Sequence, residues 1–145
     1  MSEPLTARIR SDLNQARRSK DRLRTTVLTT ILSEIRNREI ELGRDATDDD
    51  VIGVVTRAIK QRKEAADQMR AGGREELAAK EEREAELLAD YTPEALSEDE
   101  VRGLVREIIA GGADNMGAVM GALMPEIRGR FEGKEANRVV REELG

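Results

Sequence analysis

The side chains of this chain best suited to chemistry are three cations in one glycine-broken turn, Arg128, Arg130 and Lys134. Gly129 and Gly133 interrupt the run, and a helix is expected to begin close to Lys134. Backbone N–H groups and the positive end of a helix favour phosphate at such a place, and nearby cations add to that preference. The pattern therefore predicts a phosphate-contact site, with an ordinary solvated turn as the alternative.

The composition argues against covalent catalysis and against metal-dependent chemistry. The chain has no cysteine and no histidine, which excludes disulfides, thiolate chemistry and hydrolytic triads with an imidazole base. No phosphate-cradling glycine loop is evident, and capping of a helix explains Asp48, Asp49 and Asp50 better than a metal site does. We therefore expect no catalytic residue, no cofactor, no bound metal and no enzymatic activity of the chain on its own.

The run before the turn repeats small and sulfur-containing residues every four positions. It contains Met116, Gly117, Met120, Gly121, Met124 and Pro125. A glycine costs roughly 1 kcal/mol relative to alanine inside a helix, so something must offset that cost. Close packing of a neighbouring helix against Gly117 and Gly121, beside a flexible methionine ridge, is the favoured explanation. Close approach of a ligand is the alternative.

Apolar residues recur at helical spacing along nearly the whole chain, which predicts an all-α protein. Thr47 with Asp50 and Ser97 with Glu100 resemble capping boxes, and Gly43 suits the carboxyl end of a helix. The expected helices cover about 4–19, 22–42, 48–71, 74–90, 98–110, 115–124 and 134–144, with Asp21 and Asp114 as further caps.

A domain boundary is expected at Pro93, because the residue before a proline avoids the helical region. Residues 1–93 are predicted to form an N-terminal domain of about four helices, and residues 94–145 a small three-helix bundle. Tyr91 and Phe131 are the only aromatic residues. Both cores must therefore be aliphatic, and Phe131 is expected to anchor its loop in the second core.

The charge of the chain is unevenly distributed. The net charge of −5 argues against indiscriminate binding of nucleic acid. Residues 8–24 nevertheless hold seven basic and two acidic side chains, a net charge of +5, and residues 128–141 hold five against two, a net charge of +3. Such patches can meet phosphate on an acidic protein. With no apolar run near the roughly 20 residues of a membrane span, and no evident signal peptide, we expect a soluble cytoplasmic protein.

Several segments carry a family resemblance. They are Met116-Gly-Ala-Val-Met-Gly-Ala-Leu-Met-Pro, Ile127-Arg-Gly-Arg with Gly133 and Asn137, Lys60-Gln-Arg-Lys-Glu-Ala-Ala-Asp-Gln, and Ala71-Gly-Gly-Arg-Glu-Glu-Leu-Ala. Over essentially its whole length the chain resembles the GatB/YqeY family. That family unites small free-standing YqeY-like proteins with the C-terminal tail of the B subunit of glutamyl/aspartyl-tRNA amidotransferase. The resemblance implies a helical N-terminal domain followed by a three-helix domain.

The resemblance also implies a partner, because the amidotransferase tail is thought to contact tRNA while the catalytic chemistry lies elsewhere. By position, Arg128, Arg130 and Lys134 correspond to the basic turn. Its scaffold corresponds to Gly117, Met120, Gly121, Pro125, Gly129 and Gly133. The sequence departs from the family pattern at Glu126, Phe131 and Glu132. The family commonly has lysine at the first position and a small residue followed by Asp or Asn at the other two, so this turn is bulkier and less positive.

The sequence leaves three functions open. The first is a non-catalytic adaptor or binding protein for tRNA or another structured RNA, read by shape and phosphate. The second is an accessory role in glutamine-dependent amide transfer, a carbon–nitrogen ligation. The third is a protein–protein module for translation-related partners, which would use charged helix faces such as residues 60–63 and 81–84.

Overall fold

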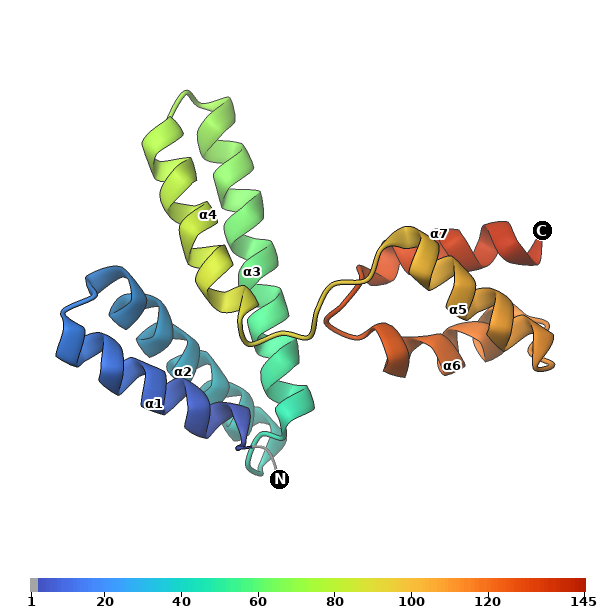
Figure 1. The fold of residues 1–145 in the computed structure, drawn as a ribbon, viewed down its shortest axis with the longest axis horizontal. Coiled ribbons are helices and arrows are strands. Elements are labelled where there is room, and N and C mark those ends of the chain that lie inside the picture. Colours follow the sequence, from blue (N-terminus) through green and yellow to red (C-terminus); the bar gives the residue numbers. More distant parts are fainter. Residues whose placement is uncertain (1–2) are drawn as a thin grey trace. The chain divides into compact units, whose positions relative to one another are not determined.

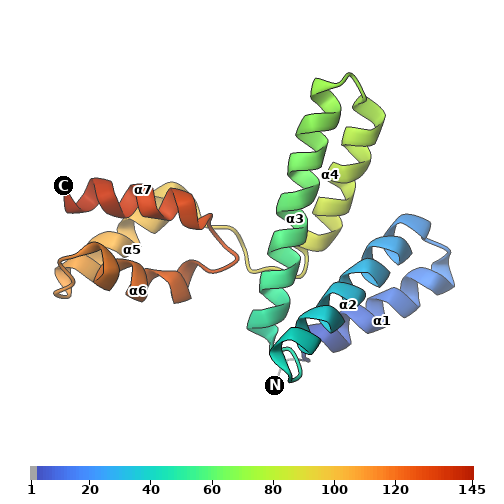
Figure 2. The ribbon, with the colours of Figure 1, turned by 180° about the vertical axis from the view of Figure 1, so that it is seen from behind.

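The computed structural model describes residues 3–145, which form helices and connecting segments with no β-strand in that range. The all-α class expected from the sequence is confirmed. The chain divides into two compact units, of which the first ends at Thr92 and the second begins at Pro93. Figures 1 and 2 show the helices of each unit from opposite sides, and each unit is described by itself.

The first unit consists of two antiparallel helix hairpins (Figure 1). Its helices are α1 (Leu5–Ser19), α2 (Arg22–Leu42), α3 (Asp48–Ala71) and α4 (Glu75–Ala89). Local signals set their ends as expected: Asp21 caps α2, Thr47 and Asp50 form a capping box at α3, and Gly43 closes α2 with a φ of 69°. The first helix, expected from about residue 4, begins at Leu5, and Pro4 is its N-cap residue.

The core of the first unit draws on all four helices and on Tyr91, which lies two residues after the end of α4. It contains Ile9, Leu13, Val27, Leu28, Ile31, Ile35, Val51, Val55, Ala58, Leu88 and Tyr91. Farther along the second hairpin the buried residues are alanines, Ala66, Ala78 and Ala85. Leu77, whose apolar side chain predicts an anchor of α4 in the core, is instead 45% exposed, because the neighbouring Ala78 takes the interior position. Small interior side chains allow α3 and α4 to lie close together.

The second unit is a three-helix bundle with an aliphatic core. Its helices are α5 (Glu98–Ala110), α6 (Met116–Ile127) and α7 (Gly133–Leu144). Its buried residues are Val101, Val105, Val119, Leu123, Ile127, Ala136, Val139 and Val140. Ser97 and Glu100 form the expected capping box, and Phe131 packs against this core as expected.

Both ends of α6 differ from the sequence expectation. Asn115, and not Asp114, caps the helix: its Oδ1 accepts from the N–H of Ala118 at 2.9 Å. Pro125 does not end the helix, which continues to Ile127. A proline removes only its own N–H, so Arg128 can still donate to the carbonyl of Met124, at 3.0 Å. Burial of Ile127 in the core favours the extra turn.

Within residues 3–145, no helix has both the length and the apolar character needed to cross a bilayer.

Candidate nucleic-acid interface

The turn between α6 and α7 is closed by two backbone hydrogen bonds to one carbonyl. The N–H groups of Arg130 and Phe131 both donate to the carbonyl of Ile127, at 2.8 and 3.1 Å. Gly129, which lies between Ile127 and Arg130, has a φ of 74°, a left-handed conformation that glycine adopts without the strain of a side chain. Because Phe131 also packs on the core, the turn has a fixed position within its unit.

Arg130 has a structural role in this turn. Its Nε donates to the carbonyl of Glu94 at 3.0 Å and its Nη1 to the carbonyl of Glu126 at 3.4 Å. The carbonyl of Arg130 in turn accepts from the N–H of Leu96 at 2.8 Å. These bonds tie the segment before α5 to the turn. Arg130 therefore holds the predicted site together, besides contributing charge to it.

Arg128 and Lys134 are the cations of the turn that remain available. Both residues are exposed, whereas Arg130 is half-buried. In the part of the chain that the structure describes, neither Arg128 nor Lys134 has a carboxylate within ion-pair distance. The three cations look equivalent in the sequence, but in the structure Arg130 holds the turn, whereas Arg128 and Lys134 have no carboxylate partner within residues 3–145.

Most other arginines of the second unit are paired with carboxylates. Arg102 lies 3.1 Å from Glu98 and 3.4 Å from both Glu142 and Glu143. Arg106 lies 2.8 Å from Glu143. Arg138 contacts Glu98, Glu135 and Glu142. Hydrogen bonds from Arg102 and then Arg138 lower the pKa of Glu98, and Glu98 in turn raises the pKa of Arg138. Besides Arg128 and Lys134, only Arg141 among the remaining cations of this unit is exposed and unpaired in the described residues.

The amino end of α7 lies in the same turn. Glu132 is its N-cap residue, but the Glu132 side chain makes no capping hydrogen bond, and Gly133 begins the helix. The first N–H groups of α7 are therefore left for solvent or for an anion. The second unit holds seven basic and eleven acidic side chains, Glu132 among them. The free cations of the turn therefore lie in a unit that is acidic as a whole.

The packing explanation for Gly117 and Gly121 is wrong. A Cβ at Gly121 would have no neighbouring heavy atom within 4 Å, and one at Gly117 would meet only Oδ1 of Asn115, at 3.6 Å. Both glycines are exposed, as are Ala118 and Ala122, because α6 buries its opposite face. We call the exposed surface of Gly117, Ala118, Gly121 and Ala122 the small-residue face. Helix packing within the unit does not offset the cost of its glycines.

The methionine ridge does pack as expected. Met116, Met120 and Met124 are partly buried and contact the second core. A Cβ at Gly133 would lie 4.0 Å from the Cε of Met124, which is ordinary van der Waals contact. Packing therefore explains the methionines of this segment, while the glycines of the small-residue face need another reason.

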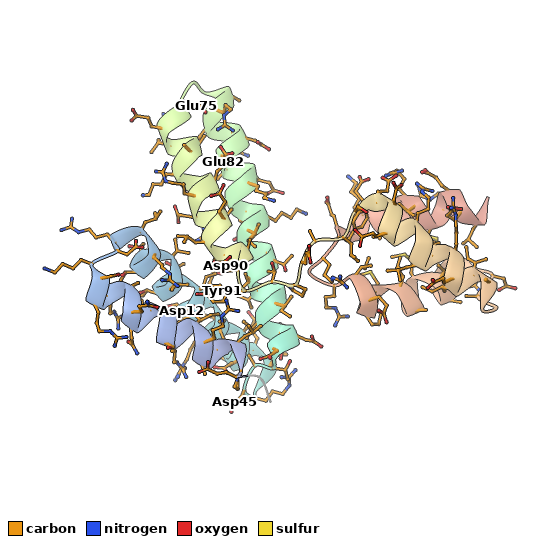
Figure 3. The ribbon with its side chains drawn as sticks, viewed as in Figure 1. Asp12, Asp45, Glu75, Glu82, Asp90 and Tyr91 are labelled. Atoms are coloured by element: carbon orange, nitrogen blue, oxygen red, sulfur yellow. The ribbon has the colours of Figure 1, made fainter. Side chains whose placement is uncertain are left out.

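The basic stretch of residues 8–24 contains cations of two kinds. Arg8 lies over the ring of Tyr91, 4.8 Å from its centroid, and Arg24 lies 3.6 Å from Asp12. The hydroxyl of Tyr91 donates to Asp12, toward which it points in Figure 3. Burial, together with the bond to Asp12, raises the pKa of Tyr91 to about 12. Arg10, Arg17, Arg18, Lys20 and Arg22 are exposed and, within residues 3–145, have neither a carboxylate nor an aromatic ring as partner.

Sequence reasoning missed the cluster around Tyr91 because no local spacing signals it. Asp12 and Tyr91 stand 79 positions apart in the chain, and each has an ordinary sequence neighbourhood. The net charge of residues 8–24 predicts a basic patch, but it does not distinguish the unpaired cations from Arg8 and Arg24.

The aspartates at the start of α3 serve the fold. Oδ1 of Asp48 accepts from the N–H of Leu5 at 3.0 Å, which joins α1 to α3. Asp50 completes the capping box and pairs with Arg44 at 2.7 Å. The hydrogen bond from Arg44, followed by those from Thr47, holds the pKa of Asp50 well below its usual range. Over residues 3–145 no group of three or more carboxylates is arranged to hold a metal ion.

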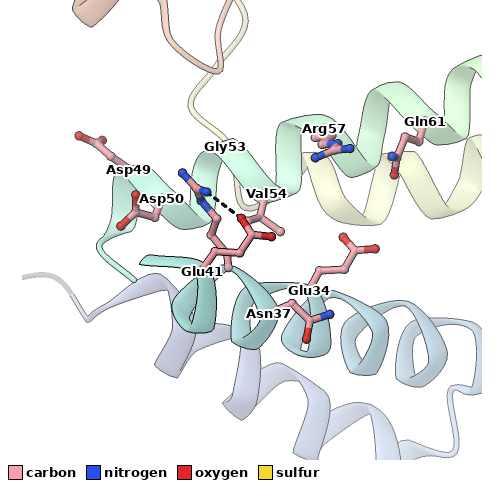
Figure 4. A pocket seen from close by; sticks show the side chains of 10 residues that line it. Glu34, Asn37, Glu41, Asp49, Asp50, Gly53, Val54, Arg57 and Gln61 are labelled. Atoms are coloured by element: carbon pink, nitrogen blue, oxygen red, sulfur yellow. Dashed lines mark hydrogen bonds and ion pairs between the residues drawn. The ribbon is translucent and has the colours of Figure 1, made fainter. Parts of the chain in front are cut away.

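A groove of about 650 Å³ lies between α2 and α3 (Figure 4). Its lining includes Glu34, Asn37, Arg38, Glu41, Asp49, Asp50, Arg57 and Gln61. Arg38 donates to Glu41 at 3.0 Å, and Asp50 is engaged as described above. The groove is thus lined by charges of both signs, some of which pair with one another.

Comparison with known proteins places this geometry in a family context. A family model described as Yqey-like protein matches residues 6–144. The chain is similar to a protein of Pyrenophora tritici-repentis named Altered inheritance of mitochondria protein 41, mitochondrial. The two sequences are 28% identical over 144 residues, which cover 95% of this chain and 80% of that protein. Proteins of the same name from Vanderwaltozyma polyspora and Saccharomyces cerevisiae are 36% and 32% identical over 85 and 84 residues.

The two yeast matches cover 57% of this chain and 45% of each relative, so the chain matches less than half the length of those proteins. The names of all three relatives contain the word mitochondrial. A cytoplasmic location of this chain stays a prediction.

Proposed function

The chain belongs to the YqeY-like protein family, and we propose that it is a non-catalytic adaptor that binds structured RNA, in particular tRNA, through the α6–α7 turn. One observation carries this proposal: Arg128 and Lys134 are exposed and, within residues 3–145, have no carboxylate partner, in a unit that pairs Arg102, Arg106 and Arg138 internally. Guanidinium and ammonium groups of this kind bind phosphate oxygens. The uncapped amino end of α7 adds backbone donors at the same place.

The small-residue face supports the same proposal. Its glycines expose helix backbone that a sugar–phosphate chain can approach closely. Because Pro125 has no N–H, the carbonyl of Gly121 lacks its usual helical donor and remains an acceptor. The ribose 2′-hydroxyl is a donor that DNA lacks. A ligand on this face is therefore expected to be RNA in preference to DNA.

The mode of recognition that we propose is shape and phosphate, without stacking on bases. Tyr91 is buried in the first core and Phe131 packs against the second. Recognition of single strands relies on aromatic platforms, and both aromatic side chains of this chain already have other roles. Double-helical regions of a folded RNA, which are recognised through phosphates and 2′-hydroxyls, fit these residues better.

The experiment that tests the proposal compares Arg128→Glu with Arg141→Glu in the full chain. Both residues are exposed, both lie in the second unit, and both substitutions change the net charge by the same amount. We expect Arg128→Glu to weaken binding of a tRNA transcript about tenfold and to lower the slope of log affinity against log salt by about one. Arg141→Glu is expected to bind almost as the wild type does. Equal losses for the two variants would contradict a site at the turn.

The non-catalytic part of the proposal has its own test. The purified chain is expected to release no ammonia from glutamine, because it has neither a cysteine nucleophile nor a histidine to activate a hydroxyl for that step. Glutaminase activity that co-purifies with the chain and disappears when the chain is denatured would overturn this part.

A further inference from the structure

Four cations surround the turn between α1 and α2. Arg17 and Arg18 lie in the last turn of α1, Lys20 is its C-cap residue, and Arg22 is the first residue of α2. All four are exposed, and within residues 3–145 none is paired with a carboxylate. Figure 3 shows side chains that end in nitrogen and extend outward from this turn. We call these four residues the α1–α2 tip.

The helix dipoles explain only part of this arrangement. Arg17 and Arg18 lie at the negative carboxyl end of α1, where cations are favourable. Arg22, however, lies at the positive amino end of α2, which has no acidic residue in its first turn. The neighbouring Asp21 is engaged as the cap, since its Oδ1 accepts from the N–H of Arg24 at 3.1 Å. The charge of Arg22 therefore has no favourable partner within the described fold.

Lys20 is a second unexplained choice. Its φ of 60° lies in the left-handed region, which glycine or asparagine adopts with less strain than lysine does. The turn is nevertheless well closed: the N–H of Lys20 donates to the carbonyl of Arg17 at 3.2 Å, and that of Asp21 to the carbonyl of Ala16 at 2.9 Å. A cation thus occupies a position where the backbone favours another residue. The closed turn also lowers the entropy lost when a ligand binds.

From these observations we propose that the α1–α2 tip is a second phosphate-binding surface, which holds the backbone of structured RNA. The inference rests on the proposed function for the class of ligand and adds a separate surface on the other unit. Arg10 extends this surface, because it is exposed and lies two helical turns before Arg17 on the same face of α1.

The composition of the tip favours RNA over an anionic membrane. Helices and loops that bind membranes place large apolar or aromatic side chains beside their cations. The nearest apolar residue, Leu23, is half-buried. The large apolar side chains that the structure shows exposed, Ile40 and Leu77, lie at the far end of α2 and on α4. A surface of cations without apolar neighbours fits a polyphosphate backbone.

The test removes the tip charges while keeping the turn intact. The variant combines Arg17→Gln, Arg18→Gln, Lys20→Asn and Arg22→Gln, because glutamine is a good helix former and asparagine tolerates the left-handed region. The matched control removes four exposed cations elsewhere in the same unit, with Arg36→Gln, Arg57→Gln, Lys60→Gln and Arg74→Gln. Circular dichroism checks that both full-length variants are folded. Lys20→Asn with Arg22→Gln is the smaller replacement if the fourfold variant is not.

The measured quantity is the affinity for a tRNA transcript over a series of salt concentrations, with Arg128→Glu assayed in parallel. We expect the tip variant to bind at least about tenfold more weakly near physiological salt and to lose about two to three from the salt slope. The control is expected to stay within about twofold of the wild type.

The outcomes separate the two proposals. If the tip variant binds like its control while Arg128→Glu is weakened, the tip inference is wrong and the proposed site stands. If the tip variant is weakened while Arg128→Glu is not, the tip stands and the α6–α7 turn is not the site. A wild type that binds no tRNA refutes both. Sedimentation of the wild type, but not of the tip variant, with phosphatidylserine vesicles at unchanged tRNA affinity would overturn the assignment to RNA.

Discussion

The small-residue face makes a prediction in which stability and binding change in opposite directions. Gly121 lies in the middle of α6, it is exposed, and an added Cβ would have no neighbour within 4 Å. Replacing such a glycine with alanine removes backbone freedom from the unfolded chain at no steric cost. We therefore expect Gly121→Ala to raise the free energy of unfolding by about 0.5–1 kcal/mol, the difference between the two residues inside a helix.

Binding is predicted to fall when the face is filled. Gly121→Gln adds a longer neutral side chain that is still a good helix former, so the fold is kept while the approach to the helix backbone is blocked. The expected result is a loss of about tenfold in affinity for a tRNA transcript, since a clash displaces the phosphate contacts nearby. Thermal unfolding followed by circular dichroism, together with filter binding, measures both quantities on the same preparation.

A matched control comes from α5 of the same unit. Gly103 is also exposed, lies inside a helix and has open space around its Cβ position. Gly103→Ala is expected to stabilise the chain as Gly121→Ala does, and Gly103→Gln is expected to bind tRNA like the wild type. The reasoning is refuted if Gly121→Gln and Gly103→Gln bind equally well. Destabilisation by Gly121→Ala would show instead that the space at this glycine is not open.

Three further predictions concern the contacts that hold each unit together. Tyr91 is the only tyrosine, so the near-ultraviolet absorbance of its phenolate should titrate near pH 12 in the folded chain and near pH 10 in urea. Because the pKa of Tyr91 is higher in the folded chain, about 2–3 kcal/mol of the free energy of unfolding that is present below pH 10 is lost as the pH rises to 12. Glu84→Ala should lower the free energy of unfolding in urea by about 1–3 kcal/mol, because it leaves the largely buried Arg62, 3.5 Å away, without its partner. Arg130→Gln should destabilise the second unit by about 1 kcal/mol, measured by thermal unfolding, through its lost bonds to the carbonyls of Glu94 and Glu126.

Each of these predictions has a control. Tyr91→Phe should abolish the absorbance change altogether, and equal folded and unfolded midpoints would contradict a buried hydroxyl. Replacing both Arg62 and Glu84 with methionine should recover most of the stability that Glu84→Ala loses, because no unpaired charge then remains. For Arg130, a fall in tRNA affinity as large as that of Arg128→Glu, with unchanged stability, would assign it to the RNA and not to the turn.

Local sequence signals predicted the secondary structure well. The capping boxes at Thr47 and Ser97, the cap at Asp21 and the closing glycine at Gly43 all occupy the expected positions. Each depends on atoms no more than about four residues apart, so the chemistry that decides it can be read from a short window. The error at Pro125 has the same basis, because burial of Ile127 outweighed the local signal to stop.

The sequence alone determined the helices, the largely aliphatic cores, the exclusion of cysteine and histidine chemistry, and the three cations that mark the turn. It could not determine which cations are free. Arg128 and Arg130 stand two positions apart in the same turn, yet only Arg130 reaches the carbonyl of Glu94. Nor could it show that Gly121 faces open space, or that Tyr91 binds Asp12. These properties depend on neighbours that are distant in the chain, and only packing of the helices brings such neighbours together.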